Sequence, residues 1–422
     1  MAMVRPPGCS PRPHRRRTLL LTLLCGLSLS GCASRMEVPK LVYLALGTNA
    51  EQSIDAQLVE GFQKRLGSLE AGYRQIHPAT RFQFSVYTEV QIADAIRHRQ
   101  RAGLGPDLLF INGDTARQLF EQGLIDPFPA SEALQKLFSP EYLKRLRMPD
   151  GALVGLPVLV QPQVACFNRK RLPDPPGTLT ELLAASAKGH TIGLSVDLDS
   201  LVWSAGSMGA IEGVDRTLTG KRPTADQQQR MASWMGWLQN ASDQQRITFY
   251  ANQTTLQDEF AGGRLDWISC SSLSLPRLRH SLGASLGVTN LPSGPGGLAS
   301  PLNRLRVLAL GRSSSQEGRQ RALAFSRFTV NPLVQRSLTV GSQNLLPANR
   351  FVQVPVQSSR ILQAMVTSQE GGRQTDALVG LLNDNDPRLA AAQSLITQLV
   401  FGEMSPTSAT NTLISLFARR QP

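Results

Sequence analysis

Polar residues that could bind a small molecule follow three apolar, strand-like runs of the sequence. They lie at residues 47–49, 87–89 and 112–114, and the candidates are Gly47, Thr48, Asn49, Glu89, Gly113 and Asp114. Open parallel sheets bind ligands beyond the carboxyl ends of their strands, so these groups would face one cleft. Each loop alone is explained more simply as a turn, because glycine, asparagine and aspartate favour turns. Three such loops at one sheet edge favour a binding site.

A second group of candidate residues lies in the segment 197–203. Trp203 could offer a flat apolar face to a sugar ring, and Asp199 could accept hydrogen bonds from its hydroxyl groups. The alternatives are a packing role for Trp203 and a solvated Asp199. Asp197 and Asp199, on an extended segment, could also share a face as the paired carboxylates of a glycoside hydrolase. Hydroxyl binding or solvation is favoured over that chemistry.

Other kinds of chemistry have little support. The histidines beyond residue 31 have no ligand-like spacing, so we expect no metal site and no cofactor; they are His77, His98, His190 and His280. Residues 205–209 (AGSMG) do not fit the Gly-x-Ser-x-Gly pattern of a nucleophile elbow. The glycine-rich stretch 292–297 lacks the lysine and hydroxyl order of a P-loop. We therefore expect a binding protein and not an enzyme.

The elements that would position these residues alternate between strand and helix. The apolar run 41–46 is typical of a strand covered on both faces, whereas residues 81–87 alternate as a half-buried strand does. Between them, apolar residues spaced four apart from Ile54 to Leu66 predict one face of a helix. A second helical stretch leads to the apolar run 108–111. This β–α–β repetition predicts an α/β fold with mostly parallel sheets flanked by helices.

The N-terminus has the pattern of an export signal. Five arginines and no acidic residue precede an apolar run at residues 19–29. That run is too short for a membrane span, which needs about 20 apolar residues. It ends in Leu29-Ser30-Gly31-Cys32, which resembles the bacterial lipobox. We expect residues 1–31 to be a signal peptide and Cys32 to carry lipid; an ordinary secretory signal or a short membrane anchor is the alternative.

Charge and cysteine content narrow the class of partner. Loss of the leader would lower the number of lysines and arginines from 44 to 39, while the 31 acidic residues would all remain. The formal net charge would fall from +13 to +8. No block of five or six like charges follows the leader, which disfavours nucleic-acid binding. Cys166 and Cys270 could pair after export or remain two buried thiols. The sequence leaves both possibilities open.

Six segments follow the order of a pattern seen in one known family. The first joins GPDLLFI (105–111) to LFEQGLIDP (119–127). The others are GALVGLP (151–157), CFNRKRL (166–172), PGTLTELL (176–183), FAGGRLDW (260–267) and GSQNLLPA (341–348). Together they resemble the family 1 extracellular solute-binding proteins, the maltose-binding-like group.

The chain departs from that family's pattern at one point. After the segment that matches FAGGRLDW, sugar binders of the family often carry a Gly-Pro-Trp-like run, whereas this chain has Cys270-Ser271-Ser272-Leu273. Hydroxyl groups replace an expected stacking ring, so that either the solute is small and polar or the stacking ring comes from elsewhere in the chain. Both alternatives argue against a long maltodextrin.

The resemblance implies two α/β lobes joined by a hinge that the chain crosses about three times. Residues 1–31 would be the signal peptide and 32–40 the anchor linker. Lobe 1 would comprise residues 41–157 and 299–345, and lobe 2 residues 158–290 and 350–422. The crossings would lie near residues 157–163, 290–300 and 345–349.

The resemblance also implies a function. A monomeric, lipid-anchored receptor on the extracytoplasmic face of the membrane would bind a sugar, polyol or glycoside between its lobes and deliver it to the permease subunits of an ABC importer. The alternatives are a receptor for an anionic or peptide-like solute and a lipid-anchored glycoside-acting enzyme. Beyond the residues above, the ligand-binding candidates are Gln161, Ser271, Ser272, Asn303 and Ser342.

Overall fold

The computed structural model describes residues 39–49, 54, 56–375, 378 and 387–418. The predicted signal peptide, Cys32 and most of the predicted linker lie outside these residues. The chain divides into one unit at Met1–Pro39 and another at Lys40–Pro422. Everything below concerns the second unit.

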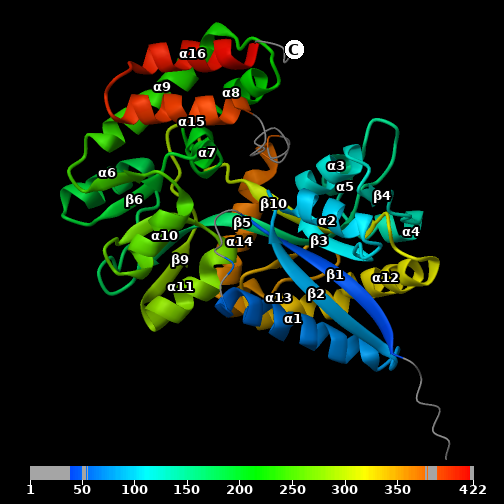
Figure 1. Cartoon of the computed structure of the whole chain (residues 1–422). Coiled ribbons are helices and arrows are strands. Elements are labelled where there is room, and N and C mark those ends of the chain that lie inside the picture. The colour runs from blue at the N-terminus through cyan, green and yellow to red at the C-terminus, as the bar shows by residue number, and fades with distance from the viewer. Residues whose placement is uncertain (1–38, 50–53, 55, 376–377, 379–386, 419–422) are drawn as a thin grey trace, which may run out of the picture. The chain divides into compact units, whose positions relative to one another are not determined.

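The strands of this unit are linked by pairing in the order β2-β1-β3-β10-β5-β8-β6-β7, while β4 pairs with β10, and β9 and β11 pair with β5 (Figure 1). Their bounds are β1 Lys40–Thr48, β2 Thr80–Thr88, β3 Leu108–Asn112, β4 Ile125–Asp126, β5 Leu156–Asn168, β6 Ile192–Ser195, β7 Ile247–Tyr250, β8 Trp267–Ser271, β9 Leu286–Thr289, β10 Asn303–Gly311 and β11 Leu346–Pro347.

The helices cover both faces of this sheet. Their bounds are α1 Ala56–Arg74, α2 Ile92–Arg101, α3 Gly113–Glu121, α4 Glu132–Gln135, α5 Pro140–Leu146, α6 Leu179–Ala187, α7 Leu198–Ser207, α8 Ile211–Leu218, α9 Ala225–Ser242, α10 Gln253–Ala261, α11 Leu275–Leu282, α12 Gln316–Thr329, α13 Pro332–Ser342, α14 Arg360–Gly371, α15 Pro387–Val400 and α16 Pro406–Ala418. None of the helices in the described part of the chain is both long and apolar enough to cross a membrane.

Parallel pairing brings the predicted loops to one sheet edge. β1 pairs in parallel with β2 and with β3, so that Thr48 lies opposite Thr88 and Leu46 opposite Phe110. The carboxyl ends of these three strands therefore meet, as the order of the loops predicts. Two details differ from the prediction, because β1 continues through Thr48 and α3 already begins at Gly113.

The long strand β5 joins two groups of strands. Its first half pairs with β10 and β11, and its second half with β8 and β9, all antiparallel. Antiparallel strands thus occupy the centre of the sheet, while the β1–β2–β3 and β7–β6–β8 groups on either side are parallel. The predicted α/β class is confirmed, with a mixed sheet.

Two apolar cores lie along this strand. Val164 and Cys166 belong to a core with β1, β3, β10 and α11, whereas Ala165 and Phe167 belong to a core with α7, α9, α15 and α16 (Figure 1). Successive side chains of a strand point to opposite faces. One strand therefore contributes to both cores, and its backbone connects them.

Cys166 of β5 and Cys270 of β8 form a disulfide, with Cα atoms 5.9 Å apart and a sequence separation of 104 residues. Of the two possibilities that the sequence leaves open, the structure has the paired one. The bond connects two adjacent antiparallel strands beside the residues Ser271 and Ser272.

Candidate functional site

A polar cavity of about 500 Å³ lies at the edge where β1, β2 and β3 end. The starts of α7 and α10 and one face of α15 form its other side. Its lining residues are Asn49, Glu89, Asn112, Asp197, Leu198, Asp199, Asn252, Gln253, Thr254, Thr255, Arg304, Leu389 and Gln393. The composition is that of a site built for hydrogen bonding.

Arg306 of β10 holds the ends of β1, β2 and β3 together on one side of the cavity through hydrogen bonds. Its guanidinium donates to Glu89 Oε1 at 2.6 Å and to Asn112 Oδ1 at 2.8 Å. It also donates to the carbonyls of Gly47 at 2.5 Å and Phe110 at 2.9 Å. Arg306 is 2% exposed, and burial lowers the pKa of its guanidinium, opposed by the charge of Glu89. A buried charge of this kind needs its partners, so the four groups are held in fixed positions.

The amide of Asn112 extends this network to the cavity surface. Its Nδ2 donates to Asn49 Oδ1 at 2.7 Å, and its backbone N–H donates to Glu89 Oε1 at 3.1 Å. Residues from the ends of three strands are thereby joined by direct hydrogen bonds. The oxygen of Asn49 is therefore engaged, whereas its Nδ2 has no hydrogen-bond partner within the described structure.

The opposite side of the cavity is set by two carboxylates in different roles. Asp197 precedes α7 and accepts from Ser195 Oγ at 2.8 Å, from the Gln253 backbone N–H at 3.2 Å and from Gln393 Nε2 at 3.0 Å. Asp199 lies in the first turn of α7 and pairs with Arg304 of β10 at 2.5 Å. The expectation of an extended segment at 197–199 is therefore wrong, because α7 begins at Leu198. The carboxylates have separate partners and do not form a pair.

Three residues that line the cavity each carry a buried polar atom with no hydrogen-bond partner within the described structure: Asn49 Nδ2, Glu89 Oε2 and Gln253 Oε1. One is a donor and two are acceptors. A buried polar group without a partner costs about 1–3 kcal/mol. A ligand hydroxyl, which both donates and accepts, would satisfy such a set.

A narrow pocket of about 10 Å³ adjoins the polar cavity between β5 and β10, and we call it the floor of that cavity. It shares Gln253 and Arg304 with the polar cavity, and its other polar lining residues are Gln161, Gln163 and Ser271. Gln161, also on this floor, lines a third cavity on its far side.

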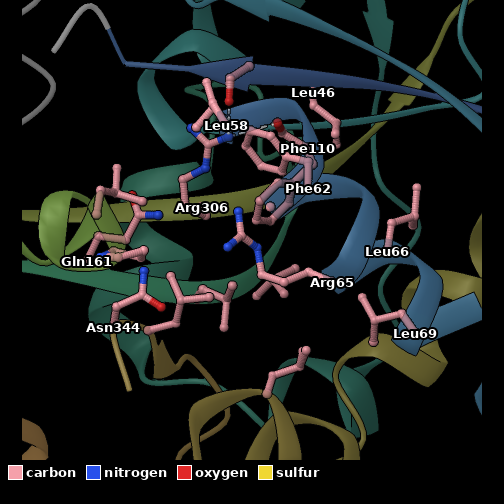
Figure 2. A pocket seen from close by; sticks show the side chains of 18 of the residues that line it. Leu46, Leu58, Phe62, Arg65, Leu66, Leu69, Phe110, Gln161, Arg306 and Asn344 are labelled. Atoms are coloured by element: carbon pink, nitrogen blue, oxygen red, sulfur yellow. Dashed lines mark hydrogen bonds between the residues drawn. The ribbon is translucent and has the colours of Figure 1, made fainter. Parts of the chain in front are cut away.

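That third cavity is apolar and lies under α1. It has a volume of about 220 Å³ and is lined by side chains of α1, of the sheet and of α12, α13 and α11 (Figure 2). It shares no lining residue with the polar cavity.

The candidate residues from the sequence are distributed over these cavities. Asn49, Glu89 and Asp199 line the polar cavity, while Gln161 and Ser271 line the floor. Gly47 lines the apolar cavity. A Cβ added at Gly47 would lie 2.3 Å from Glu89 Oε1, so no larger residue fits there without a shift. The candidates that line none of these cavities are Thr48, Gly113, Asp114, Trp203, Ser272, Asn303 and Ser342.

Trp203 lies within a core of aromatic rings. It is 0% exposed, and its ring centroid is 6.3 Å from that of Trp237 and 6.4 Å from that of Trp267. The ring therefore presents no face to the polar cavity. The packing role that the sequence offered as the alternative is the one that this geometry fits.

Four residues that shape the site were not among the candidates: Asn112, Gln253, Arg304 and Arg306. One signal for two of them is present in the sequence, because Arg304 and Arg306 lie in an otherwise apolar run, RLRVLALG (304–311). Two positive charges within such a run predict buried partners. Across the described residues, no group of three or more His, Cys, Asp or Glu could hold a metal ion.

Known proteins with this architecture bind solutes. The family model for bacterial extracellular solute-binding proteins matches residues 71–362. The GacH receptor of Streptomyces glaucescens, solved unliganded and with acarbose, aligns with a TM-score of 0.70 at 15% identity over 91% of this chain and 100% of that chain. No curated protein matches the sequence.

Two further structures extend the likeness in fold. The maltose-maltodextrin binding protein of Alicyclobacillus acidocaldarius aligns with a TM-score of 0.64 at 18% identity over 90% of this chain and 100% of that chain. A solute-binding protein of an ABC transporter from Thermotoga lettingae, bound with α-D-tagatose, aligns with a TM-score of 0.65 at 14% identity over 90% and 99%. The predicted fold and the predicted resemblance are confirmed, and this chain belongs to the family of bacterial extracellular solute-binding proteins.

Proposed function

We propose that the protein is the solute receptor of an ABC importer and that it binds a sugar or sugar-like solute in the polar cavity. The observation that carries this proposal is the set of buried, unpartnered atoms on Asn49, Glu89 and Gln253. They combine one donor with two acceptors around a cavity of about 500 Å³. Sugar hydroxyl groups match that combination, since each can donate and accept.

The charges of the cavity favour a neutral solute over an anionic one. Three carboxylates (Glu89, Asp197 and Asp199) line it, against the single guanidinium of Arg304, which is already paired with Asp199. An anion entering this lining would be repelled by the carboxylates, because a like charge nearby disfavours the charged form of a group. A sugar-like solute is also consistent with the structural neighbours, which include proteins solved with acarbose and with tagatose.

The same proposal includes the predicted lobes and the predicted anchor. Lobe 1 (41–157 and 299–345) and lobe 2 (158–290 and 350–422) would close over the solute, with crossings near 157–163, 290–300 and 345–349. The Arg304–Asp199 pair would join the lobes beside the cavity, since it connects β10 to α7. The closed form would be recognised by the permease subunits, and lipid at Cys32 would hold the receptor on the extracytoplasmic face of the membrane.

Calorimetric titration with a panel of sugars, polyols and glycosides tests the proposal. At least one should bind saturably and lower the radius of gyration measured by X-ray scattering. A Gln253→Met variant keeps the size of the side chain and removes Oε1, so we expect the affinity for that solute to fall about tenfold.

Gln229→Met is the matched control, because Gln229 is exposed on α9, away from the cavity lining. Its affinity should equal that of the unmodified protein. Absence of saturable binding across the panel, or equal affinity in the Gln253→Met variant, would contradict the proposal.

A further inference from the structure

We propose that the apolar cavity under α1 is a second binding site, specific for a small molecule that joins an anionic group to a short apolar body. This inference goes beyond the proposed solute receptor and does not depend on it. It is based on the shape, charge and unpartnered polar atoms of a cavity that shares no lining residue with the polar cavity.

The apolar part of the ligand is indicated by the walls. Leu58, Phe62 and Leu66 of α1 line the cavity together with Leu46 and Phe110 of the sheet (Figure 2). The volume is about 220 Å³. An engineered apolar cavity of about 150 Å³ binds benzene, so this cavity has room for one ring with a substituent or for a short alkyl chain. Filling it would remove apolar surface from water.

The anionic part is indicated by the charged residues. The described lining contains three arginines and no carboxylate. Arg306 pairs with Glu89 and Arg277 with Asp258, but Arg65 has no ion pair or hydrogen bond within the described structure. Its Cζ lies 5.0 Å from the centroid of Phe62, and burial lowers the pKa of its guanidinium. A desolvated cation in this setting favours an anionic partner.

The polar end of the cavity provides further attachment points. Gln161 Oε1, Asn344 Oδ1, Gln257 Nε2 and Ser274 Oγ are buried and have no hydrogen-bond partner in the described structure. Gln161 and Asn344 are 3% and 2% exposed. Figure 2 shows Arg65 extending from α1 toward the side of the cavity where these two residues lie. A carboxylate could accept from Gln257 Nε2 and Ser274 Oγ. The unpartnered oxygens of Gln161 and Asn344 can only accept, so they suit a donor group of the ligand.

Octanoate is the probe, with octanol as its neutral counterpart and octylammonium as its cationic one. We expect calorimetric titration of the whole protein to show one saturable octanoate site. Octanol should bind about tenfold or more weakly because it lacks the charge. Octylammonium should show no binding, because it would meet three arginines.

Two pairs of variants on α1 localise the site. Gly61→Leu should abolish octanoate binding, because Gly61 lines the cavity and a Cβ there lies 3.7 Å from Arg65 Nη1. Gly67→Leu is its control, since nothing lies within 4 Å of that Cβ and both changes favour the helix equally. Arg65→Gln should weaken octanoate about tenfold and leave octanol unchanged, whereas Lys64→Gln, at an exposed position, should change neither.

The proposal of a second site is overturned if octanoate does not bind, or if it still binds to the Gly61→Leu variant. Equal affinity for octanoate and octanol, with no effect of Arg65→Gln, overturns its preference for anions. The sugar titration of the same variants separates the two proposals, because the cavities share no lining residue. Failure of octanoate alone leaves the solute receptor standing, and failure of the sugar panel alone leaves the second site standing.

Discussion

At the residue scale, Arg306 determines how the ends of β1, β2 and β3 are held. One guanidinium bonds to Glu89, Asn112 and the carbonyl groups of Gly47 and Phe110. Its Cζ also lies 4.7 Å from the centroid of the Phe110 ring. The side chains of Arg306 and Glu89 are 3% and 8% exposed. If one of the two charges were removed, water could therefore not solvate the other.

Replacement of Arg306 by methionine should therefore destabilise the protein strongly. The change leaves the Glu89 carboxylate buried without its ion partner, and breaking a buried pair in this way costs about 3–5 kcal/mol. Urea unfolding followed by circular dichroism measures the free energy of unfolding. A Glu89→Gln change added to Arg306→Met should recover part of the loss, because it removes the stranded charge.

Arg312→Met provides the comparison for that measurement. Arg312 pairs with Asp126 at 3.3 Å, but its side chain is 60% exposed, and exposed pairs contribute at most about 1 kcal/mol. Similar losses in the two arginine variants would show that the Arg306 network is not a buried, interdependent unit.

Some site residues could be predicted from the sequence because strand order alone places them. Asn49 and Glu89 follow parallel strands, so their convergence at one edge needs no knowledge of side-chain packing. Trp203 could not be placed in this way, because the rotation of α7 directs it into the core with Trp237 and Trp267. Gln253 could not either, since only tertiary packing brings the start of α10 to the cavity.

At the element scale, β5 carries the connection between the two cores. The strand runs from Leu156 to Asn168, and its pairing changes from β10 and β11 to β8 and β9 along its length. The disulfide joins β5 to β8 in the second half of the strand. The bond thereby closes a long loop of chain that contains β6 and β7 and the helices α6 to α10.

Loss of this disulfide should lower the free energy of unfolding. The two cysteines are 104 residues apart in the sequence, and a disulfide stabilises chiefly by restricting the unfolded chain, more so for long loops. We expect a Cys166→Ala/Cys270→Ala variant to lose about 2–4 kcal/mol in urea unfolding. Dithiothreitol should destabilise the unmodified protein by a similar amount and have no effect on the variant; equal stability of the two proteins without reductant would refute a stabilising role.

Elements with a strong local pattern were predictable, and those defined by tertiary contacts were not. The strands near 41–46 and 108–111 are marked by apolar runs and the strand near 81–87 by alternation, and β1, β3 and β2 lie there. α7 has no such marker, because a short Asp-Leu-Asp-Ser segment is compatible with either a helix start or an extended chain. The antiparallel insertion of β10 between β3 and β5 is likewise a non-local pairing that no periodicity reveals.

At the scale of the whole molecule, the proposal places the receptor at the extracytoplasmic face of a membrane. Lipid at Cys32 is the proposed means of attachment, and surface charge is the alternative to be tested. After loss of the leader, 39 basic residues stand against 31 acidic ones, and a diffuse charge of this size could adhere to an anionic surface. Salt distinguishes the two modes, because it screens charge and leaves buried acyl chains in place.

Cys32→Ser tests the anchor directly. If lipid at Cys32 attaches the receptor, the unmodified protein should stay in the membrane fraction of the expressing bacterium after a wash with about 1 M salt, where the screening length is about 3 Å. The Cys32→Ser variant should move to the soluble fraction, with the same solute affinity, because the polar cavity lies in the unit that begins at Lys40. Cys25→Ser is the matched control, since Cys25 lies seven residues earlier within the apolar run and its loss should leave attachment unchanged. Retention of Cys32→Ser after the wash would assign attachment to another part of the chain; release of the unmodified protein by salt alone would assign it to charge.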